Sequence, residues 1–327
     1  MSGSSRSGWL WGLVAYTCWG LVPLYFAVLK RYGLSAGEIL AQRITWSLPL
    51  LLLLVASRRP LREELRRALG DRSLLLRLSL SAALLAINWL LYIYATVTDR
   101  VAEASHGYFL LPLVNAALGS AVLDERLRPA HYPALALVAL SVALPVTLDG
   151  QWSWLALTLP LTFGLYSLVR KQVCVESAAG LTVETALLLL PAAAYLLLLA
   201  HSGDNHLGTT PAATAWILLS GPVTVVPLLA FTLALRRLTL LAVSFLQFIS
   251  PAVQLLLALT VLGEELDRPR LAALACAGLA VLIFLADALW AERRRARHRS
   301  SAPPALAPFA ASPDSSVPPP RPSLSSH

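Results

Sequence analysis

Residues 104–127 read ASHGYFLLPLVNAALGSAVLDERL, and residues 243–266 read VSFLQFISPAVQLLLALTVLGEEL. Aligned without a gap, the two stretches are identical at nine of 24 positions, including Pro112 with Pro251 and Glu125 with Glu264. Unrelated leucine-rich helices share leucines by chance, but a shared proline and a shared glutamate in one register are not expected. The alignment therefore indicates an internal duplication at an offset of 139 residues.

Around these stretches the chain is far more apolar than a soluble domain. Of its 327 residues, 57% are hydrophobic and 13% are charged, whereas about a quarter are charged in soluble domains. A bilayer core about 30 Å thick requires about 20 apolar residues per helix. Such runs occupy residues 9–29, 37–56, 74–96, 101–123, 131–148, 152–169, 180–200, 212–235, 240–262 and 270–290. We therefore expect an all-α integral membrane protein with ten transmembrane helices.

The duplication divides these runs into two sets of five. The first repeat is predicted at residues 9–148 and the second at residues 152–290. Because five is odd, the second repeat enters the membrane from the opposite side, so the repeats are inverted. Inverted repeats are common in secondary transporters, where two related halves open a central site to either side of the membrane.

The basic residues indicate the orientation. If residues 1–8 lie in the cytoplasm, eighteen lysines and arginines fall in inner segments and five in outer loops. Cytoplasmic loops carry this excess, so both termini are predicted on the cytoplasmic side of the membrane. Residues 291–327 are basic and then rich in proline and serine, as in a disordered tail. Within the inner segment after Pro60, the apolar residues fit either a short helix on the membrane surface or a solvated loop.

Several functional classes find no support in the sequence. The net charge of +8 belongs to loops and tails that face anionic lipid, so no nucleic-acid partner is expected. There is no HExxH, GxSxG or Walker-type motif and no His/Cys cluster at metal spacing, so no catalytic residue, cofactor, metal site or ATP-driven pump is predicted. The Gly8–Gly12 pair fits packing within the bundle or between protomers, so a monomer and a homodimer both stay open.

Several short stretches carry a family resemblance. They are GEILAQRITWS at 37–47, Asn88 with Trp89, EASHGYFLLPLVN at 103–115, YSLVRK at 166–171 and FLQFISP at 245–251. Together they resemble the RarD branch of the EamA family, in the drug/metabolite transporter superfamily, over residues 9–290. The resemblance implies a ten-span inner-membrane permease with two EamA repeats and no settled substrate. The chain departs from the branch at His106, usually apolar, and at Leu111, where an amide is common.

Ionisable side chains inside a bilayer are costly unless they are paired or face a cavity, so they are functional candidates. In the outer half and near the midplane, the predicted pathway or gating residues are Glu38, Gln42, Arg43, Asn88, Tyr92, Glu103, His106, Tyr108 and Asn115. Arg43 is predicted about 10 Å below the start of its helix. We expect an outer gate formed by Glu38, Arg43 and Glu103.

The second repeat supplies Arg170, Lys171, Glu184 and Gln247 as pathway or gating candidates. We expect an inner gate formed by Arg170, Lys171 and Glu184. Gln247 takes the place of Tyr108 at the repeat offset. The spans are predicted to rock about the hinge residues Pro112 and Pro251.

Structural alternatives exist for several candidates. Arg43 could form a static ion pair with a carboxylate, and Glu38 could cap its helix, where an acid is favourable against the helix dipole. His106 could be a packed, hydrogen-bonded residue. Glu125 and Glu264 could stabilise the ends of their spans.

The preferred function is a secondary permease that exports or exchanges a small metabolite or drug-like solute by alternating access. Its partners are that solute and the lipid bilayer. If transport is proton-driven, Glu38, Glu103, His106 and Glu184 are the candidate proton carriers. Apolar and aromatic walls with few charges favour an uncharged or zwitterionic solute. The alternative function is a membrane scaffold or sensor without transport.

Overall fold

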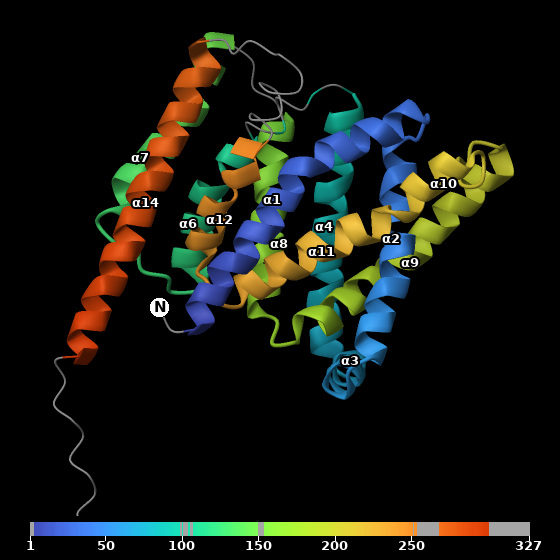
Figure 1. Ribbon diagram of the computed structural model, residues 1–327, viewed down its shortest axis with the longest axis horizontal. Coiled ribbons are helices and arrows are strands. Elements are labelled where there is room, and N and C mark those ends of the chain that lie inside the picture. The colour runs from blue at the N-terminus through green and yellow to red at the C-terminus, as the bar shows by residue number, and fades with distance from the viewer. Residues whose placement is uncertain are drawn as a thin grey trace, which may run out of the picture. The chain divides into compact units, whose positions relative to one another are not determined.

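The computed structural model describes residues 3–98, 100, 104, 107–149, 154–250, 252–253 and 268–300 (Figure 1). All of the described secondary structure is helical, which confirms the predicted all-α class. The helices are α1 Gly3–Arg31, α2 Ala36–Ala56, α3 Arg59–Gly70, α4 Arg72–Val97, α6 Leu111–Val122, α7 His131–Asp149, α8 Trp154–Gln172, α9 Ser177–Ser202, α10 Pro211–Leu218, α11 Ser220–Leu235, α12 Leu240–Leu246 and α14 Arg268–Ser300. The described residues up to Asp287 form one compact unit, and the described residues from Ala288 onward belong to a second unit.

Within the described residues, five helical segments are long and apolar enough to cross a bilayer. They are Arg6–Arg31, Ala36–Ala56, Arg72–Val97, Ser177–Ser202 and Pro211–Leu235. Shorter apolar helices occupy Gly107–Val122, His131–Leu144 and Ala275–Ala291. All of these segments overlap predicted spans. The five long segments do not test the total of ten.

Proline interrupts two of the predicted spans. The run at 212–235 is divided at Leu219 into α10 and α11. Pro222 lies four residues after Leu218, so it cannot donate to the Leu218 carbonyl and its ring clashes there. In the run at 101–123, a turn at Leu110 precedes α6, and Pro112 lies in the first turn of that helix. A proline fits this position because the first helical N–H groups have no intrahelical acceptor.

The segment after Pro60 forms helix α3. The helical alternative is therefore the one observed, with Leu61 and Ala68 buried. Leu65 packs against the same clusters as these two residues, whereas Leu69 is 54% exposed. The apolar face of α3 thus covers part of the bundle.

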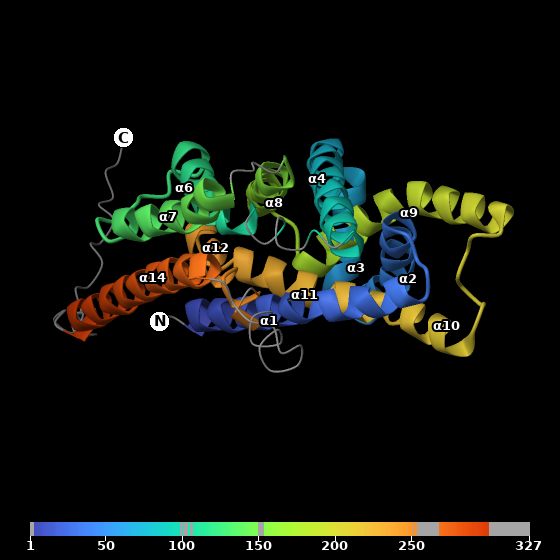
Figure 2. The same cartoon turned by 90° about the horizontal axis from the view of Figure 1, so that it is seen from above.

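Helices from the two predicted repeats pack on one another. The most extensive pairs are α2 with α9, α1 with α11 and α4 with α8, and α6 also packs on α12. Figure 2 shows α4, α6 and α8 in one row and α1 and α11 in another. Gly8 faces Leu238 and Gly12 faces Leu246, so this pair of glycines packs within the chain. Rings fill the space between the rows, including Tyr16, Trp19, Phe163 and Phe231.

Candidate functional site

A cavity lies where α1, α2, α4 and α8 meet. Its volume is about 60 Å³, enough for several water molecules. The lining residues are Trp19, Val22, Phe26, Arg43, Asn88, Trp89, Tyr92, Tyr108, Phe163, Gln247 and Ser250. Five of the predicted pathway residues therefore line one cavity: Arg43, Asn88, Tyr92, Tyr108 and Gln247. They come from four separate stretches of the chain, because only Asn88 and Tyr92 lie on the same helix.

Arg43 is the charged residue among the described residues that line the cavity. The residue is 2% exposed, and its Nε donates a hydrogen bond of 2.9 Å to Thr224 Oγ1. Its guanidinium carbon lies 4.3 Å from the ring centroid of Trp89 and 5.2 Å from that of Phe26. Both distances fall within the range of cation–π attraction. Among the described residues no carboxylate lies within ion-pair distance of Arg43, so the static ion pair is not observed there.

Asn88 holds Tyr108 in the wall of the cavity. The Asn88 Nδ2 donates to the Leu159 carbonyl at 2.9 Å and to Thr162 Oγ1 at 3.0 Å. The Tyr108 hydroxyl donates to Asn88 Oδ1 at 2.9 Å. The Asn88 amide is thus occupied by the protein, and its role in the cavity is to fix the orientation of Tyr108.

Aromatic rings make up most of the remaining wall. Tyr108 packs edge-on against Tyr92 and Phe163, with ring centroids 5.8 and 6.2 Å apart. Trp19 packs edge-on against Phe163 at 5.8 Å. Edge-on contacts are one of the preferred arrangements of ring pairs, so they stabilise the wall.

Gln247 and Ser250 line the cavity from the segment that follows α12. Gln247 is the C-cap residue of α12. The Ser250 Oγ donates to the Tyr16 carbonyl at 2.7 Å, which ties this segment to α1. No hydrogen bond to the Gln247 side chain is made by the described residues, so its amide is available in the cavity.

Arg170 and Glu184 form a second, deeply buried group. The Arg170 Nε lies 3.4 Å from Glu184 Oε1, with the two side chains 3% and 2% exposed. The Ser81 hydroxyl donates to the same Glu184 oxygen, whereas Glu184 Oε2 has no hydrogen-bond donor among the described residues. Gly180 leaves room for the guanidinium, because a Cβ there would lie 2.8 Å from Arg170 Cζ.

A smaller cavity of about 10 Å³ connects this pair with the Arg43 region. Glu184 lines it together with Trp89 and Thr224. Trp89 also lines the larger cavity, and Thr224 binds Arg43. The volume is near the lower limit for one water molecule. The two buried groups are therefore separated by only a few side chains.

Lys171 lies apart from this pair, unlike the predicted inner gate. Its Nζ is 3.6 Å from Glu125 Oε1 and donates to the carbonyls of Leu235 and Leu238. The Glu125 carboxylate accepts hydrogen bonds from the Leu240 N–H at 3.0 and 3.1 Å. Lys171 and Glu125 thus connect the end of α11 to the start of α12, which agrees with the structural alternative for Glu125.

Glu38 binds His206 in the loop between α9 and α10, and not Arg43 as the predicted outer gate requires. The residue is 1% exposed, and its carboxylate accepts from the backbone N–H of His206 at 2.9 Å and lies 2.8 Å from His206 Nδ1. The Ser35 hydroxyl oxygen caps α2 by accepting a hydrogen bond from the backbone N–H of Glu38. Glu38 therefore fastens the segment between α9 and α10 to the start of α2.

The other predicted residues occupy separate positions. Gln42 is buried, and its Oε1 accepts from Trp46 Nε1 at 3.0 Å. Asn115 is buried against Gly164, and its Oδ1 has no donor among the described residues. Glu103, His106, Pro251 and Glu264 lie outside the described residues.

Several residues that line the cavities or bind the predicted site residues were not predicted from the sequence. Thr224 and Ser81 lie in apolar runs, where a hydroxyl usually bonds to its own helix. Trp19 and Phe26 look like ordinary lipid-facing or core rings in a leucine-rich helix. His206 lies in a polar loop, and only its contact with Glu38 distinguishes it.

Comparisons with known proteins agree with the fold. The model of the EamA-like transporter family matches residues 6–147. An uncharacterized transporter of Pseudomonas aeruginosa is 41% identical over 294 residues, covering 89% of this chain and 96% of that protein. Protein RarD of Escherichia coli is 37% identical, with 90% and 98% covered, and Protein RarD of Streptomyces exfoliatus is 38% identical, with 92% and 96% covered.

A solved structure titled "Crystal structure of protein" has the same fold. It superposes with a TM-score of 0.63 at 16% identity, covering 85% of this chain and 97% of the other. Together with the long apolar helices, the sequence relatives establish both the family and the membrane location. The chain is a multi-pass membrane protein and a RarD-like member of the EamA-like transporter family.

Proposed function

We propose that the protein is a secondary permease that moves a small metabolite or drug-like solute through the cavity around Arg43 by alternating access. The observation that carries the proposal is the meeting of five polar residues, predicted independently as pathway residues, at this one cavity. A buried cavity with a few convergent polar groups in an otherwise apolar wall is typical of a small-molecule site. The family, whose members include named transporters, supports the same function.

The proposal includes ten spans in two inverted repeats, at residues 9–148 and 152–290. The family model covers residues 6–147, close to the first of these repeats. The helix pairs give further support. Exchanging the repeats replaces α1 with α8 and α11 with α4, so it converts the α1–α11 pair into the α8–α4 pair, and both pairs are observed. The α2–α9 and α6–α12 pairs convert into themselves.

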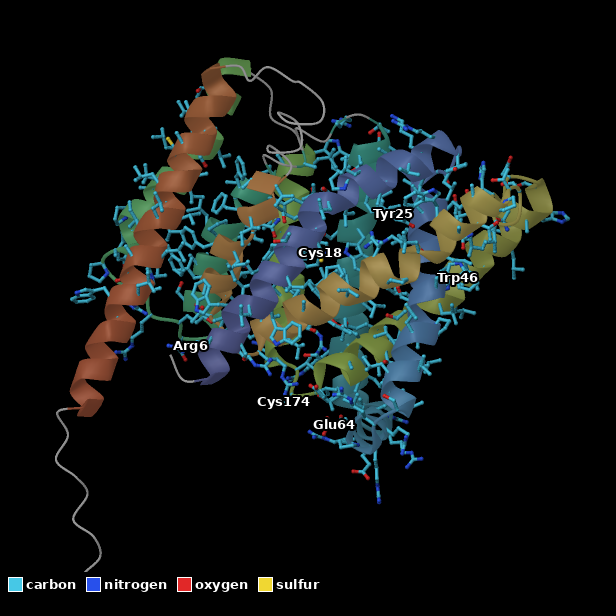
Figure 3. All side chains as sticks on the ribbon, viewed as in Figure 1. Arg6, Cys18, Tyr25, Trp46, Glu64 and Cys174 are labelled. Carbon is cyan, nitrogen blue, oxygen red and sulfur yellow. The ribbon has the colours of Figure 1, made fainter. Side chains whose placement is uncertain are left out.

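The proposed orientation places both termini in the cytoplasm. Figure 3 shows Arg6, Glu64 on α3 and Cys174 between α8 and α9 toward the same lower edge of the view. This edge carries the basic inner segments that predict the cytoplasmic side, in keeping with the positive-inside rule. The Glu38–His206 contact then belongs to the outer side.

In this scheme the Arg170–Glu184 pair restricts the inner side of the pathway, and the Glu38–His206 contact holds the outer side. Proton coupling is proposed at Glu184, because its Oε2 has no donor among the described residues and because Glu184 lines the smaller cavity. Pro112 is proposed as one hinge, since the helix is already interrupted at Leu110. The proposed cycle exports or exchanges its solute.

A matched pair of tryptophan substitutions tests the permease. Val22 lines the cavity and is 6% exposed, whereas Leu24 on the same helix is 40% exposed. We expect Val22→Trp to fill the cavity and stop transport, and Leu24→Trp to preserve it. The measurement is metabolite profiling of cells and medium with each variant at equal amounts of inserted protein.

Solutes that change with wild type and Leu24→Trp but not with Val22→Trp support the permease. Unchanged solute levels with wild type, or equal export by Val22→Trp, contradict it. If Val22→Trp does not insert, Val22→Phe provides the smaller obstruction.

A further inference from the structure

The cavity is unusual in how its positive charge is balanced. A buried guanidinium is costly unless hydrogen bonds or a negative charge compensate it. Two arginines are buried in the part of the chain that the structure describes, Arg43 at 2% and Arg170 at 4% exposed. Arg170 has the Glu184 carboxylate at 3.4 Å. Arg43 has no carboxylate partner within the same described residues.

The remaining contacts of Arg43 compensate it only in part. A guanidinium has five N–H donors, and Arg43 uses the one on Nε to bind Thr224. The rings of Trp89 and Phe26 attract the cation from their faces. No described residue accepts a hydrogen bond from the terminal nitrogens of Arg43. The planar fork that best matches a carboxylate, sulfonate or phosphate is thus unoccupied by described residues.

The other polar groups of the cavity do not supply the missing acceptor. The Asn88 Oδ1 is used by the Tyr108 hydroxyl, and the Ser250 hydroxyl donates to the Tyr16 carbonyl. Gln247 has an amide with no described partner, and it can donate a further hydrogen bond. The available donors are therefore the terminal N–H groups of Arg43 and the amide N–H groups of Gln247, and together they fit a ligand with negatively charged acceptor oxygens.

The wall sets the character of the rest of the ligand. Trp19, Phe163 and Tyr92 line the cavity with Tyr108 and Trp89. Edge-on contacts link Trp19 to Phe163, Phe163 to Tyr108 and Tyr108 to Tyr92, so these rings form a continuous apolar surface. A flat or branched apolar body would bury its surface there, while its charged end reaches Arg43.

We infer that the transported solute is a small organic anion with an apolar or aromatic body, bound through its anionic group by the terminal nitrogens of Arg43 and the Gln247 amide. This assignment rests on the proposed permease function and specifies its substrate class. It replaces the expectation of an uncharged or zwitterionic solute, which followed from the scarcity of charges in the spans.

Three probes of similar shape and different charge test the assignment. They are benzenesulfonate, benzenesulfonamide and benzylamine, which carry a negative, no and a positive charge. Binding to the purified full-length protein in detergent is measured by isothermal titration calorimetry. We expect benzenesulfonate to bind at least about tenfold more tightly than the sulfonamide, and benzylamine not to compete. Equal affinities, tighter binding of the amine, or no binding of benzenesulfonate would overturn the assignment.

Substitutions place the anion at Arg43. Arg43→Met is expected to abolish the preference for benzenesulfonate, and Arg43→Lys to weaken it, because an ammonium lacks the planar fork. Arg77→Met removes an exposed arginine of α4 and is the matched control, with the preference intact. Gln247→Leu, which keeps the charge, is expected to weaken benzenesulfonate binding severalfold and serves if Arg43→Met does not fold. A preference that survives both Arg43→Met and Gln247→Leu would locate the anion elsewhere and overturn the proposal.

The permease and the anion assignment can fail separately. A natural solute without negative charge, whose flux stops in Val22→Trp but not in Leu24→Trp, would overturn the anion assignment and leave the permease intact. Arg43-dependent benzenesulfonate binding without any flux that Val22→Trp stops would support the anion site and contradict the permease.

Discussion

Thr224 Oγ1 accepts a hydrogen bond of 2.9 Å from Arg43 Nε, and this bond joins α11 to α2. Both residues are buried. Because Nε is engaged, the guanidinium is held with its edge and faces in defined directions, beside the rings of Trp89 and Phe26. Thr224 therefore positions the charge in the cavity without itself lining that cavity.

Replacing Thr224 with valine preserves its shape and removes the acceptor. We expect Thr224→Val to lower the free energy of unfolding by about 1.5–3 kcal/mol, the range for hydrogen bonds to charged groups. Unfolding in mixtures of mild detergent and SDS measures the change. Thr224→Ser should restore most of the loss, and Thr147→Val on the exposed face of α7 should change the stability by less than about 0.5 kcal/mol. If Thr224→Ser is as destabilised as Thr224→Val, the hydrogen bond to Arg43 does not explain the effect.

Gly180 is predicted to be intolerant of a side chain because of Arg170. A Cβ there would lie 2.8 Å from Arg170 Cζ, so Gly180→Ala should move the guanidinium away from Glu184. Separating buried charges costs about 3–5 kcal/mol. The same unfolding assay measures this loss. Gly278→Ala, where no atom lies within 4 Å of the added Cβ, should instead be neutral or stabilising by up to about 1 kcal/mol.

A double substitution shows whether the Gly180 effect acts through the ion pair. When Arg170 and Glu184 are both replaced by leucine, no ion pair is left to break, and the flexible leucine at position 170 can move away from the added Cβ. Gly180→Ala should then lower the free energy of unfolding by much less than in the wild type. An undiminished loss in that background would mean that Gly180 is required for another reason, such as close helix packing.

The proposed orientation predicts which cysteines react from each side. Cys174 is exposed between α8 and α9, and Asp204 is exposed between α9 and α10. With Cys18 and Cys276 replaced by serine, Cys174 should react with a membrane-impermeant maleimide only in inside-out vesicles. With all native cysteines replaced, Asp204→Cys should react only in right-side-out vesicles. Labelling of both positions from one side would contradict the topology.

The helices and five of the eleven residues that line the cavity could be predicted from the sequence. Polar side chains are rare inside a bilayer, so Arg43, Asn88 and Gln247 stand out against apolar runs without knowledge of their partners. Tyr92 shares a helix face with Asn88, and Tyr108 shares one with Asn115, because these pairs are four and seven residues apart. The aromatic wall gave no such signal, because Trp19 and Phe26 resemble rings that face lipid.

The pairing of the charges could not be predicted, because it depends on directions around each helix. Arg170 and Lys171 are adjacent in the sequence, but successive helical residues point about 100° apart. One therefore meets Glu184 and the other Glu125. Glu38 likewise meets His206, 168 residues away, and no pattern along α2 indicates that partner.

The division of the predicted span 212–235 at Leu219 has a local cause that hydropathy does not register. The mean hydropathy of residues 211–235 is high and gives no sign of the break. Pro222 acts on the carbonyl four residues earlier, so the end of α10 is determined by a residue inside α11.

The unbalanced charge of Arg43 has an electrical consequence. If the solute is an anion, the loaded cavity is neutral, whereas the empty cavity carries one positive charge. An inside-negative membrane potential of 100 mV acts on one elementary charge with about 2.3 kcal/mol. It therefore favours the return of the empty carrier from the outward-facing to the inward-facing state and leaves the loaded crossing almost unaffected. Export would therefore be electrogenic, and the membrane potential would control the rate at which the empty carrier returns.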